Sequence, residues 1–350
     1  MAMERYEGER EFTSCARTVK RGTPERDLRP APVSARVKSD STDSTYLRIK
    51  SMEVRGAGRI ARAAVSALRD YSESGRFSST KEFYAGLEAA GERLKSARPT
   101  AVSLPNAVGY VLAAARRNDA KGVPVREAAR RVREVCDGFI TSSLKATEMI
   151  GEYGAKRVQD GDVIMTHCNS EAVSAVLISA HEAGKKFEVV ATETRPRFQG
   201  RITASVLAKK GLDVSLIPDS AARVYMRKVD FVLVGADAIA ANGAVINKIG
   251  TSQVALVAHE TRARFYVAAE TYKLSGTTMT GELVEIEHRS PYEVVPRAWL
   301  DANKAVKVKN PAFDVTPPEY VDLIITEKGV FPPQGIIFLM KELYDVPKPA

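Results

Sequence analysis

Apolar and polar positions follow two different patterns along the chain. From about residue 46 to 158, apolar side chains recur at i, i+3 and i+4, as in AGRIARAAVSALRDYS and STKEFYAGLEAAGERLKSA. Because this spacing places apolar groups on one face of a helix, residues 46–158 are predicted to form a helical N-terminal domain. A long amphipathic helix, which ends near EMIGEYGA, closes this region.

After Asp160 the pattern changes to short runs of β-branched and other apolar residues, separated by helical segments. The expected strands are Val163–Met165, Phe187–Ala191, Val214–Ile217, Phe231–Val234, Phe265–Ala268 and Leu323–Ile325. Strands that alternate with helices form parallel sheets covered on both faces. The predicted fold class is therefore α/β, with the helical domain followed by a Rossmann-like parallel-sheet catalytic domain over residues 159–350.

Residues 1–45 show neither pattern. They are rich in Arg, Ser and Pro, and they carry too few apolar side chains to offset the entropy of ordering a chain. We predict a disordered basic extension whose role is open. Tyr46 to Lys50 are interpreted as the end of a helix, and Met52 is an alternative start.

Composition narrows the compartment and the partners. The apolar share of 44% and charged share of 27% are typical of a soluble globular protein. No apolar run approaches the roughly 20 residues that span a bilayer, and the N-terminus lacks the apolar core of a signal peptide. The three cysteines, Cys15, Cys136 and Cys168, are too widely spaced for a disulfide framework or a zinc site. We therefore expect a cytoplasmic protein without a membrane partner or a metal, and we expect Cys136 to lie in the core.

The net charge of +9 raises the question of nucleic acid. The basic residues are dispersed, without a Lys/Arg stripe or an aromatic stacking motif, so nucleic acid is disfavoured. A small anionic ligand explains surplus Arg and Lys equally well.

Candidate chemistry lies where the predicted strands end, because ligands of open α/β sheets bind beyond the carboxyl ends of the strands. These positions hold one thiol, several carboxylates and cations, and amides at helix starts; the segments are Thr166–Ser170, Glu193–Gly200, Asp219–Arg223, Gly235–Asp237 and Glu270–Lys273. Such a set suits a phosphorylated small molecule.

Two of these residues are candidates for proton transfer. Cys168 lies at a strand-to-helix junction, where helix amides would lower its pKa, although an inert buried cysteine is equally compatible. Asp237 is either a helix N-cap or a second proton-transfer group beside Cys168. His167 is interpreted as a hydrogen-bonded structural histidine rather than as half of a Cys-His dyad.

Two further segments suggest anion binding. RGAGRI, from Arg55 to Ile60, lacks the preceding strand and third glycine of a dinucleotide fingerprint, but an arginine with open amides at a helix start can seat a phosphate. In NGAVINKIGT, Asn247 and Lys248 form a polar pair. Lys248 is either an exposed lysine or, given its apolar neighbours, buried near a ligand.

In order along residues 50–345, several motifs resemble the isomerase family that shares its fold with regulatory subunits of translation initiation factor 2B. They are MEVRGAG, RPTAVSLPNA, GDVIMTHCNS, ETRPRFQGR, DSAARVYM, VGADAIAANGAVINKIGT, AAETYK and NPAFDVTPPEYVDLIITEKG. Three branches compete: methylthioribose-1-phosphate isomerases, non-catalytic initiation-factor subunits and archaeal ribose-1,5-bisphosphate isomerases. The presence of Cys168 and Asp237 together with Glu270–Lys273 resembles the third branch.

The resemblance implies conversion of ribose 1,5-bisphosphate to ribulose 1,5-bisphosphate, in AMP degradation ahead of a ribulose-bisphosphate carboxylase. Asp237 would serve the substrate oxygens and Cys168, as thiolate, the proton on C2 and C1; a direct hydride shift is the alternative. The implied substrate-binding residues are Arg55, Gly56, Ala57, Gly58, Arg98, Arg195, Gln199, Asn247, Lys248 and Lys273. No cofactor is implied, AMP is a candidate activator, and relatives form homo-oligomers built on dimers, in some cases hexamers. Since Arg55 and Arg98 belong to the helical region, the site is expected between the two regions.

Overall fold

Helices make up the first part of the described chain, as the apolar spacing predicts. The computed structural model describes residues 41–343 except 75–76 and 118–122. The helices are α1 (Ser41–Lys50), α2 (Ala57–Ser72), α3 (Thr80–Lys95), α4 (Ser103–Arg117) and α5 (Val125–Ala155). Their apolar faces share one core, which includes Cys136 at 0% exposure. The prediction that Cys136 is a core residue is therefore confirmed.

The start of α1 corrects the predicted extent of the N-terminal extension. Residues 41–45, expected to be disordered, form the first half of this helix. Thr42, Tyr46 and Ile49 are buried, and the Arg93 guanidinium of α3 stacks 3.5 Å from the centroid of the Tyr46 ring. Burial against the following helices thus stabilises a segment whose own composition is weakly apolar. Residues 1–40 lie outside the described residues, and the prediction for them stays a prediction.

The second part is built on a seven-stranded sheet with the order β10-β9-β7-β4-β1-β2-β3. Its strands are β1 (Val163–Thr166), β2 (Glu188–Thr192), β3 (Asp213–Ile217), β4 (Phe231–Gly235), β7 (Arg264–Ala268), β9 (Leu323–Thr326) and β10 (Gly329–Phe331). All neighbours pair in parallel except β10, which is an antiparallel edge strand. The predicted strands and the Rossmann-like fold are confirmed, and the strand order reverses at the β1–β4 pair.

A second, three-stranded antiparallel sheet was not predicted. It contains β5 (Ala238–Ile239), β6 (Val245–Lys248) and β8 (Phe313–Thr316), in the order β5-β6-β8. These strands are short, and β6 ends in the polar pair Asn247 and Lys248, so no apolar run marks it. This sheet carries Asn247, Lys248 and Phe313 to the carboxyl edge of the large sheet.

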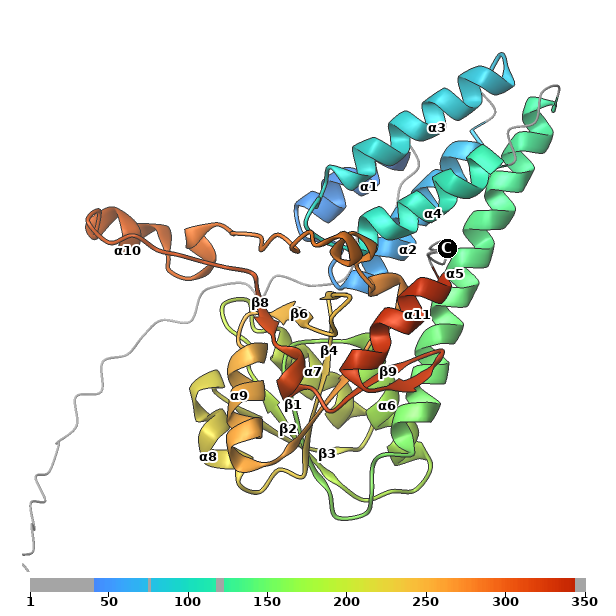
Figure 1. Cartoon of the computed structure of the whole chain (residues 1–350). Coiled ribbons are helices and arrows are strands. Elements are labelled where there is room, and N and C mark those ends of the chain that lie inside the picture. Colours follow the sequence, from blue (N-terminus) through green and yellow to red (C-terminus); the bar gives the residue numbers. More distant parts are fainter. Residues whose placement is uncertain (1–40, 75–76, 118–122, 344–350) are drawn as a thin grey trace, which may run out of the picture. The chain divides into compact units, whose positions relative to one another are not determined.

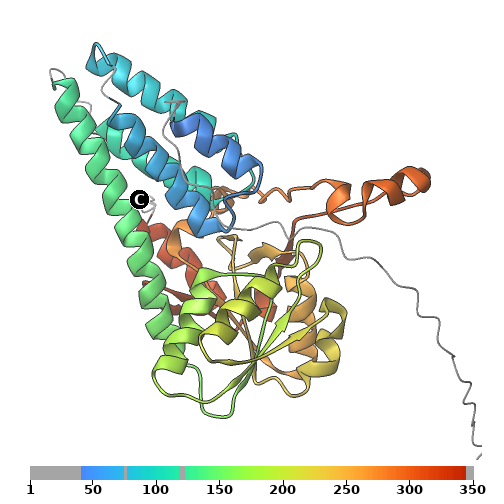
Figure 2. The same cartoon turned by 180° about the vertical axis from the view of Figure 1, so that it is seen from behind.

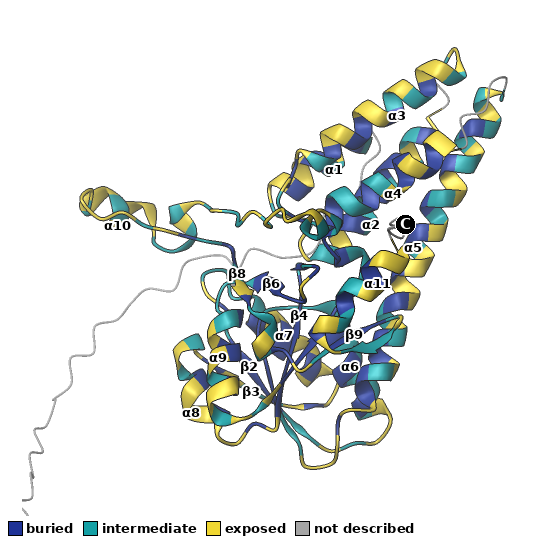
Figure 3. Ribbon diagram, in the orientation of Figure 1, coloured by how far each residue is buried: buried dark blue, intermediate teal, exposed yellow. Residues whose placement is uncertain are grey.

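Helices cover both faces of the large sheet (Figure 1). They are α6 (Glu171–Glu182), α7 (Gln199–Lys209), α8 (Ala222–Met226), α9 (Thr251–Thr261) and α11 (Ile336–Leu343). Apolar residues of α5, α6 and α7 pack on one face, and those of α8, α9 and α11 pack on the other. Colouring by burial shows the strands as the buried centre of this arrangement (Figure 3).

Helix α5 joins the two parts of the described chain. It packs against α2 at one end and against α6 at the other, and the views from front and back both show it running past the helices and the sheet (Figures 1 and 2). The described residues between 41 and 343 belong to one compact unit. The division of residues 46–350 into two domains at residue 158 stays a prediction. Among the described residues, no helix combines the length and apolarity needed to cross a membrane.

One segment projects from this unit. Between the end of the β7 region and β8, the chain extends outward, carries the short helix α10 (Arg297–Ala302) at its far end, and returns (Figures 1 and 2). At its base the outgoing and returning chains are joined by backbone hydrogen bonds, Ala312 N–H to Glu287 O at 2.8 Å and Arg289 N–H to Asn310 O at 2.8 Å. The base of this projection therefore has a fixed position beside Phe313.

Candidate active site

A pocket of about 400 Å³ opens at the carboxyl edge of the large sheet, where the strand order reverses. Its walls come from the start of α2, the loop before α4, the ends of β1 and β4, and the small sheet. Because β1 and β4 are neighbours, Cys168 and Asp237, which follow these strands, line the same pocket. Residues of both the helical region and the sheet region line this pocket, as expected for a site between them.

Cys168 lies at the turn between β1 and α6. Its φ of 71° is in the left-handed region, so the backbone turns after β1 and does not continue as an extended strand. The Cys168 N–H donates to Thr194 Oγ1 at 2.9 Å, and the Cys168 carbonyl accepts from Thr203 Oγ1 at 2.8 Å. Hydrogen bonds to two neighbouring elements thus fix a strained turn that presents the thiol to the pocket.

The expected lowering of the Cys168 pKa is wrong. Burial raises the pKa of the thiol to about 11, the Lys248 ammonium lowers it, and the Asp237 carboxylate raises it further. Helix α6 does begin nearby, with the Ser170 hydroxyl accepting from Val173 N–H at its N-cap. Desolvation outweighs the nearby cation, so the group is a neutral thiol at pH 7.

Asp237 is not a helix N-cap. The residue directly after it begins β5, and the Asp237 N–H donates to the carbonyl of Ile246 in β6 at 2.9 Å. Its carboxylate lines the pocket together with the thiol. Of the two roles left open by the sequence, the structure excludes the N-cap, and the role of Asp237 in proton transfer stays a prediction.

His167 is a structural histidine, as expected. It is 2% exposed, with Nδ1 2.6 Å from Thr192 Oγ1 and Nε2 2.9 Å from Ile249 O. A carbonyl can only accept, so Nε2 carries the proton and Nδ1 accepts from the Thr192 hydroxyl. Burial lowers the pKa of His167, which keeps the ring neutral. Both nitrogens are therefore engaged in holding the β1, β2 and α9 ends together.

The first cationic end of the pocket, as we call it, consists of Lys273 and the α2 start at Gly56–Gly58. Lys273 Nζ lies 2.7 Å from Glu270 Oε2, and both side chains are almost fully buried. Burial opposes both charges. The Glu270 carboxylate nevertheless raises the pKa of Lys273, and the Lys273 ammonium lowers the pKa of Glu270, so Lys273 stays cationic and Glu270 anionic. Helix α2 begins after Gly56, whose φ of 89° suits glycine, so open amides face the pocket at this end.

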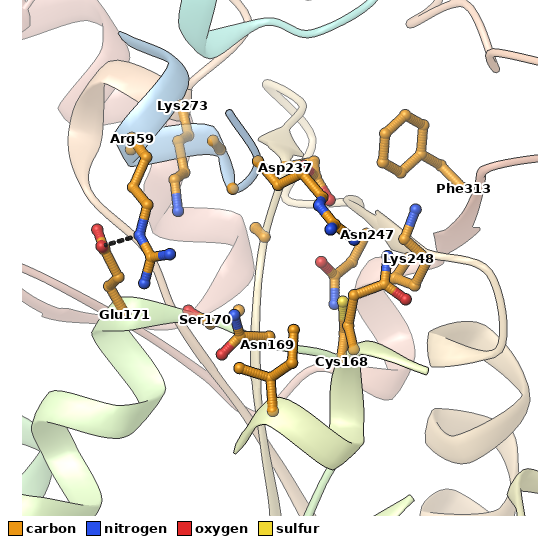
Figure 4. A pocket seen from close by; sticks show the side chains of 18 of the residues that line it. Arg59, Cys168, Asn169, Ser170, Glu171, Asp237, Asn247, Lys248, Lys273 and Phe313 are labelled. Atoms are coloured by element: carbon orange, nitrogen blue, oxygen red, sulfur yellow. Dashed lines mark hydrogen bonds and ion pairs between the residues drawn. The ribbon is translucent and has the colours of Figure 1, made fainter. Parts of the chain in front are cut away.

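The second cationic end consists of Arg98 and Lys248, which flank the ring of Phe313. The distance from the ring centroid is 5.9 Å to Arg98 Cζ and 4.6 Å to Lys248 Nζ. Lys248 Nζ also donates to Ala312 O at 2.9 Å, so this lysine is held at the pocket rather than exposed. In Figure 4, Asp237 lies between Lys273 and Lys248, and Cys168 lies nearer to Lys248.

Nearly all of the predicted site residues line this pocket. They are Cys168, Asp237, Arg55, Gly56, Ala57, Gly58, Arg98, Gln199, Asn247, Lys248 and Lys273. Arg195 does not line it. Its guanidinium donates to the Val294 carbonyl at 2.9 Å and its N–H to Asp219 Oδ2 at 2.6 Å, so its prediction as a pocket residue is wrong. The side chain is held by the base of the projecting segment.

Several pocket residues were not predicted as site residues. Arg59, Asn169, Ser170, Glu171, Glu270 and Phe313 all line the pocket. The i, i+3 spacing of Glu270 and Lys273 was a readable signal for one of them. Arg59 and Arg62 of α2 both pair with Glu171 at the start of α6, at 2.6 and 2.7 Å, and no local sequence pattern predicts these long-range contacts. Figure 4 shows the contact between Arg59 and Glu171. In the described part of the chain, no group of three or more His, Cys, Asp or Glu side chains could hold a metal ion.

The structure combines a Rossmann-like fold with a pocket that holds a thiol and a carboxylate between two cationic ends. Comparison with known proteins identifies the family that has this fold. The chain belongs to the Initiation factor 2 subunit family, whose model matches residues 53–333. It is similar in structure to the Pyrococcus horikoshii translation initiation factor eIF-2B, with a TM-score of 0.73, 29% identity, and 85% of this chain and 98% of that chain covered.

Among the similar curated proteins are isomerases of two kinds. The chain is 52% identical over 305 residues to ribose 1,5-bisphosphate isomerase of Methanocaldococcus jannaschii, and the match covers 87% of this chain and 96% of the relative. It is 40% identical over 298 residues to methylthioribose-1-phosphate isomerase of Acetivibrio thermocellus, and that match covers 81% of this chain and 86% of the relative. The chain is therefore an enzyme of the isomerase class.

Proposed function

We propose that this isomerase converts α-D-ribose 1,5-bisphosphate to D-ribulose 1,5-bisphosphate. The observation that carries the proposal is the placement of Cys168 and Asp237 between two cationic ends of one pocket. A pentose with a phosphate at each end offers an anion to each cationic end and puts its reacting carbons in the middle. The 52% identity to a relative named for this substrate supports the same choice.

The reaction needs one group at the substrate oxygens and one at the carbons. The phosphate on C1 blocks spontaneous ring opening, so a proton must be delivered to the ring oxygen as the C1–O bond breaks. In the proposed mechanism the Asp237 carboxyl gives this proton and later takes one from the C2 hydroxyl. The Cys168 thiolate removes the proton from C2 and returns it to C1. Each group then ends in the protonation state in which it began.

This mechanism requires that a proton leave Cys168 before the first step. The thiol has a pKa of about 11, with burial as the main cause. We propose that the proton moves to Asp237 when the substrate is in place, which produces the acid and the base together. The Lys248 ammonium, which lowers the pKa of Cys168, stabilises the thiolate that results.

The phosphates would be held by backbone and side-chain donors at the two ends. At the first end, the amides of Gly56, Ala57 and Gly58, with Arg55 and Lys273, present donors to one phosphate. At the second end, Arg98 and Lys248 present donors to the other. Asn247 and Gln199 remain for the sugar hydroxyls. Closure of the pocket around the substrate would limit loss of phosphate from the enediol.

The biological setting is proposed on the same basis. The product would feed a ribulose-bisphosphate carboxylase in the breakdown of AMP, in the cytoplasm, with AMP as a candidate activator and no cofactor. Relatives of this family suggest a homo-oligomer built on a dimer, with a hexamer as one form.

One assay tests the proposal. Ribose 1,5-bisphosphate and methylthioribose 1-phosphate are presented in turn, each with and without AMP, and ketose formation is measured. We expect turnover of the bisphosphate with kcat/KM at least about 100-fold above that of the methylthio sugar, because one cationic end would be left without its anion. Preference for the methylthio sugar would favour the branch of the 40% identical relative. No turnover, with stable binding to translation-factor subunits, would favour a regulatory subunit.

A second measurement distinguishes proton transfer from a hydride shift. When the reaction runs in deuterated water, the proton-transfer mechanism places deuterium on C1 of the product to the extent that the proton held by Cys168 exchanges with solvent before it is returned. Any deuterium on C1 supports proton transfer by Cys168, whereas full retention of the C2 hydrogen at C1 over many turnovers in both directions would favour the hydride shift.

A further inference from the structure

Arg98 is an unusual pocket residue because its guanidinium is buried and only partly hydrogen-bonded. Its exposure is 8%, and Nη2 donates to Glu287 Oε2 at 2.7 Å. Among the described residues, Arg98 Nε is buried without a hydrogen-bond partner. A buried donor without a partner is costly unless a ligand supplies the acceptor. The pairing with Glu287 therefore leaves donors of Arg98 for another group.

Glu287 does not line the pocket, but its position is fixed from two directions. Its carbonyl accepts from Ala312 N–H at 2.8 Å, directly before Phe313. Its second carboxylate oxygen, Oε1, accepts from Arg289 Nη1 at 3.1 Å. The carboxylate is thus held by backbone pairing and by a second arginine, and it presents only one oxygen to Arg98.

Residues 287–294, which we call the strap, continue this series of charged contacts along the projecting segment. Arg289 contacts Glu293 at 2.7 Å, and Glu293 Oε1 accepts from Arg197 Nη1 at 2.9 Å. Burial raises the pKa of Glu293, but Arg289 and Arg197 bring it down to about 2, so it is ionised. The strap also accepts the Arg195 side chain at the Val294 carbonyl. It therefore connects the loop before α4 to the loop before α7.

The charges along the strap alternate in sign and leave an excess of one positive charge. The series runs Arg98, Glu287, Arg289, Glu293 and Arg197, with each carboxylate shared between two arginines. Glu287 therefore does not cancel the charge of Arg98. An anion that approaches Arg98 meets a net positive group whose guanidinium is already oriented.

We propose that Glu287 is a positioning residue, which acts through Arg98 to orient its free donors toward an anionic group of the substrate. The proposal rests on the proposed function insofar as the anion is a substrate phosphate. A second reading of the same contact is that Glu287 competes with the anion for Arg98. The two readings predict opposite signs for the removal of the Glu287 charge, which makes the test decisive.

The test is a double-mutant cycle in the full-length enzyme. Glu287→Gln is compared with wild type, and again in an Arg98→Met background, by measuring KM, kcat and the dissociation constant of ribulose 1,5-bisphosphate by calorimetry. For coupled neighbours we expect Glu287→Gln to raise KM and the dissociation constant roughly 3- to 30-fold in the wild-type background, with kcat within about twofold. In the Arg98→Met background it should change neither constant by more than about twofold.

The controls separate positioning from folding. Glu287→Asp keeps the charge and should recover part of the lost affinity, whereas Glu285→Gln, at an exposed site two residues away, should leave both constants unchanged. An equal loss in both backgrounds would mean a structural role, and tighter binding in Glu287→Gln would mean competition; either result overturns the proposal. If neither pentose bisphosphate is bound or turned over, the proposed function fails, and the cycle is then decided with inorganic phosphate as the probe.

Discussion

The protonation of Cys168 is the residue-scale feature that most constrains the chemistry. Burial keeps the thiol neutral, with a pKa of about 11, although Lys248 opposes this. At pH 7 a group with such a pKa is ionised in about one molecule in ten thousand. A neutral thiol is a poor nucleophile, which protects it from unwanted alkylation or oxidation. It becomes a base only when another group accepts its proton, and Asp237 is a carboxylate that lines the same pocket.

The pH dependence of turnover should test the internal proton transfer from this thiol to Asp237. Because the active pair, a thiolate beside a protonated carboxyl, holds as many protons as the resting pair, kcat/KM should stay level between pH 7 and 10 and fall only as the thiol ionises, with its pKa of about 11. Cys168→Ser should bind product normally and lose about 10²- to 10⁴-fold in kcat. Initial rates and calorimetry measure both effects. A rise in kcat/KM of up to about tenfold per unit between pH 7 and 10 would mean that Cys168 loses its proton to solvent and not to Asp237.

The chemical pair could be predicted from sequence because its position depends on strand ends alone. Cys168 and Asp237 each follow a short apolar run, and neighbouring parallel strands bring such positions to one edge. The pKa of Cys168 could not be predicted, since it depends on burial and on Lys248 from another sheet. Arg195 was assigned to the pocket by its place after a strand, but the preference of its guanidinium for Val294 reflects a contact 99 residues away.

At the scale of elements, the distance between the β4 end and the α6 start affects the separation of Cys168 and Asp237, the two residues proposed to be catalytic. Gly235 is the last residue of β4, and a Cβ there would lie 2.5 Å from Ser170 Oγ and 2.6 Å from Ser170 Cβ. No side chain fits between these elements without moving one of them. Since Asp237 follows Gly235 and Cys168 precedes Ser170, any such movement changes their separation.

Gly235→Ala should therefore impair activity more than stability. We expect kcat to fall about 100-fold, because a displacement near 1 Å is enough to misplace a reacting group, and the free energy of unfolding to fall by about 1–3 kcal/mol from overpacking. Gly138→Ala in α5 is the matched control: a Cβ there meets nothing within 4 Å, so activity should be unchanged and the helix slightly stabilised. Kinetics and denaturant unfolding measure both variants. Normal kcat in Gly235→Ala would show that the site tolerates this shift.

Elements were predictable where periodicity is local and unpredictable where pairing is distant. Six strands of the large sheet, most of them buried, appear in sequence as apolar runs, and their predicted positions were confirmed. The antiparallel edge strand β10, which is only partly buried, was not predicted. Strands β5, β6 and β8 are short and partly polar, and β6 pairs with β8 across more than 60 residues. The same holds for the strap, whose Glu287 meets Arg98 at a separation of 189 residues. Nothing in either local sequence indicates the partner.

At the scale of the whole described unit, the pocket depends on the attachment of the helical part to the sheet. The helices have their own core, and the faces of the sheet have theirs. Helix α5 spans both, and Glu171 of α6 receives Arg59 and Arg62 of α2 beside the pocket. Burial raises the pKa of Glu171, but the two arginines outweigh this and lower it below its usual value. The carboxylate is therefore the form that the folded protein prefers.

The sign of this shift gives a testable link between pH and stability. A carboxyl group whose pKa is lower in the folded state than in the unfolded state stabilises the fold fully above its unfolded-state pKa. This stabilisation is lost as the pH falls from the unfolded-state pKa to the folded-state pKa. Glu171→Gln should lower the free energy of unfolding at pH 7 by on the order of 1–2 kcal/mol, because charge-assisted hydrogen bonds across the two parts are lost. The deficit should shrink as the pH is lowered from 7 to 4, since wild type loses the same contribution by protonation. Denaturant unfolding at several pH values measures this deficit.

The control is Glu88→Gln, whose partner Arg116 is exposed within the helical part. It should change the free energy of unfolding by less than about 0.5 kcal/mol at either pH. A deficit that stays constant between pH 7 and 4 would mean that the ionisation of Glu171 does not contribute to joining the two parts.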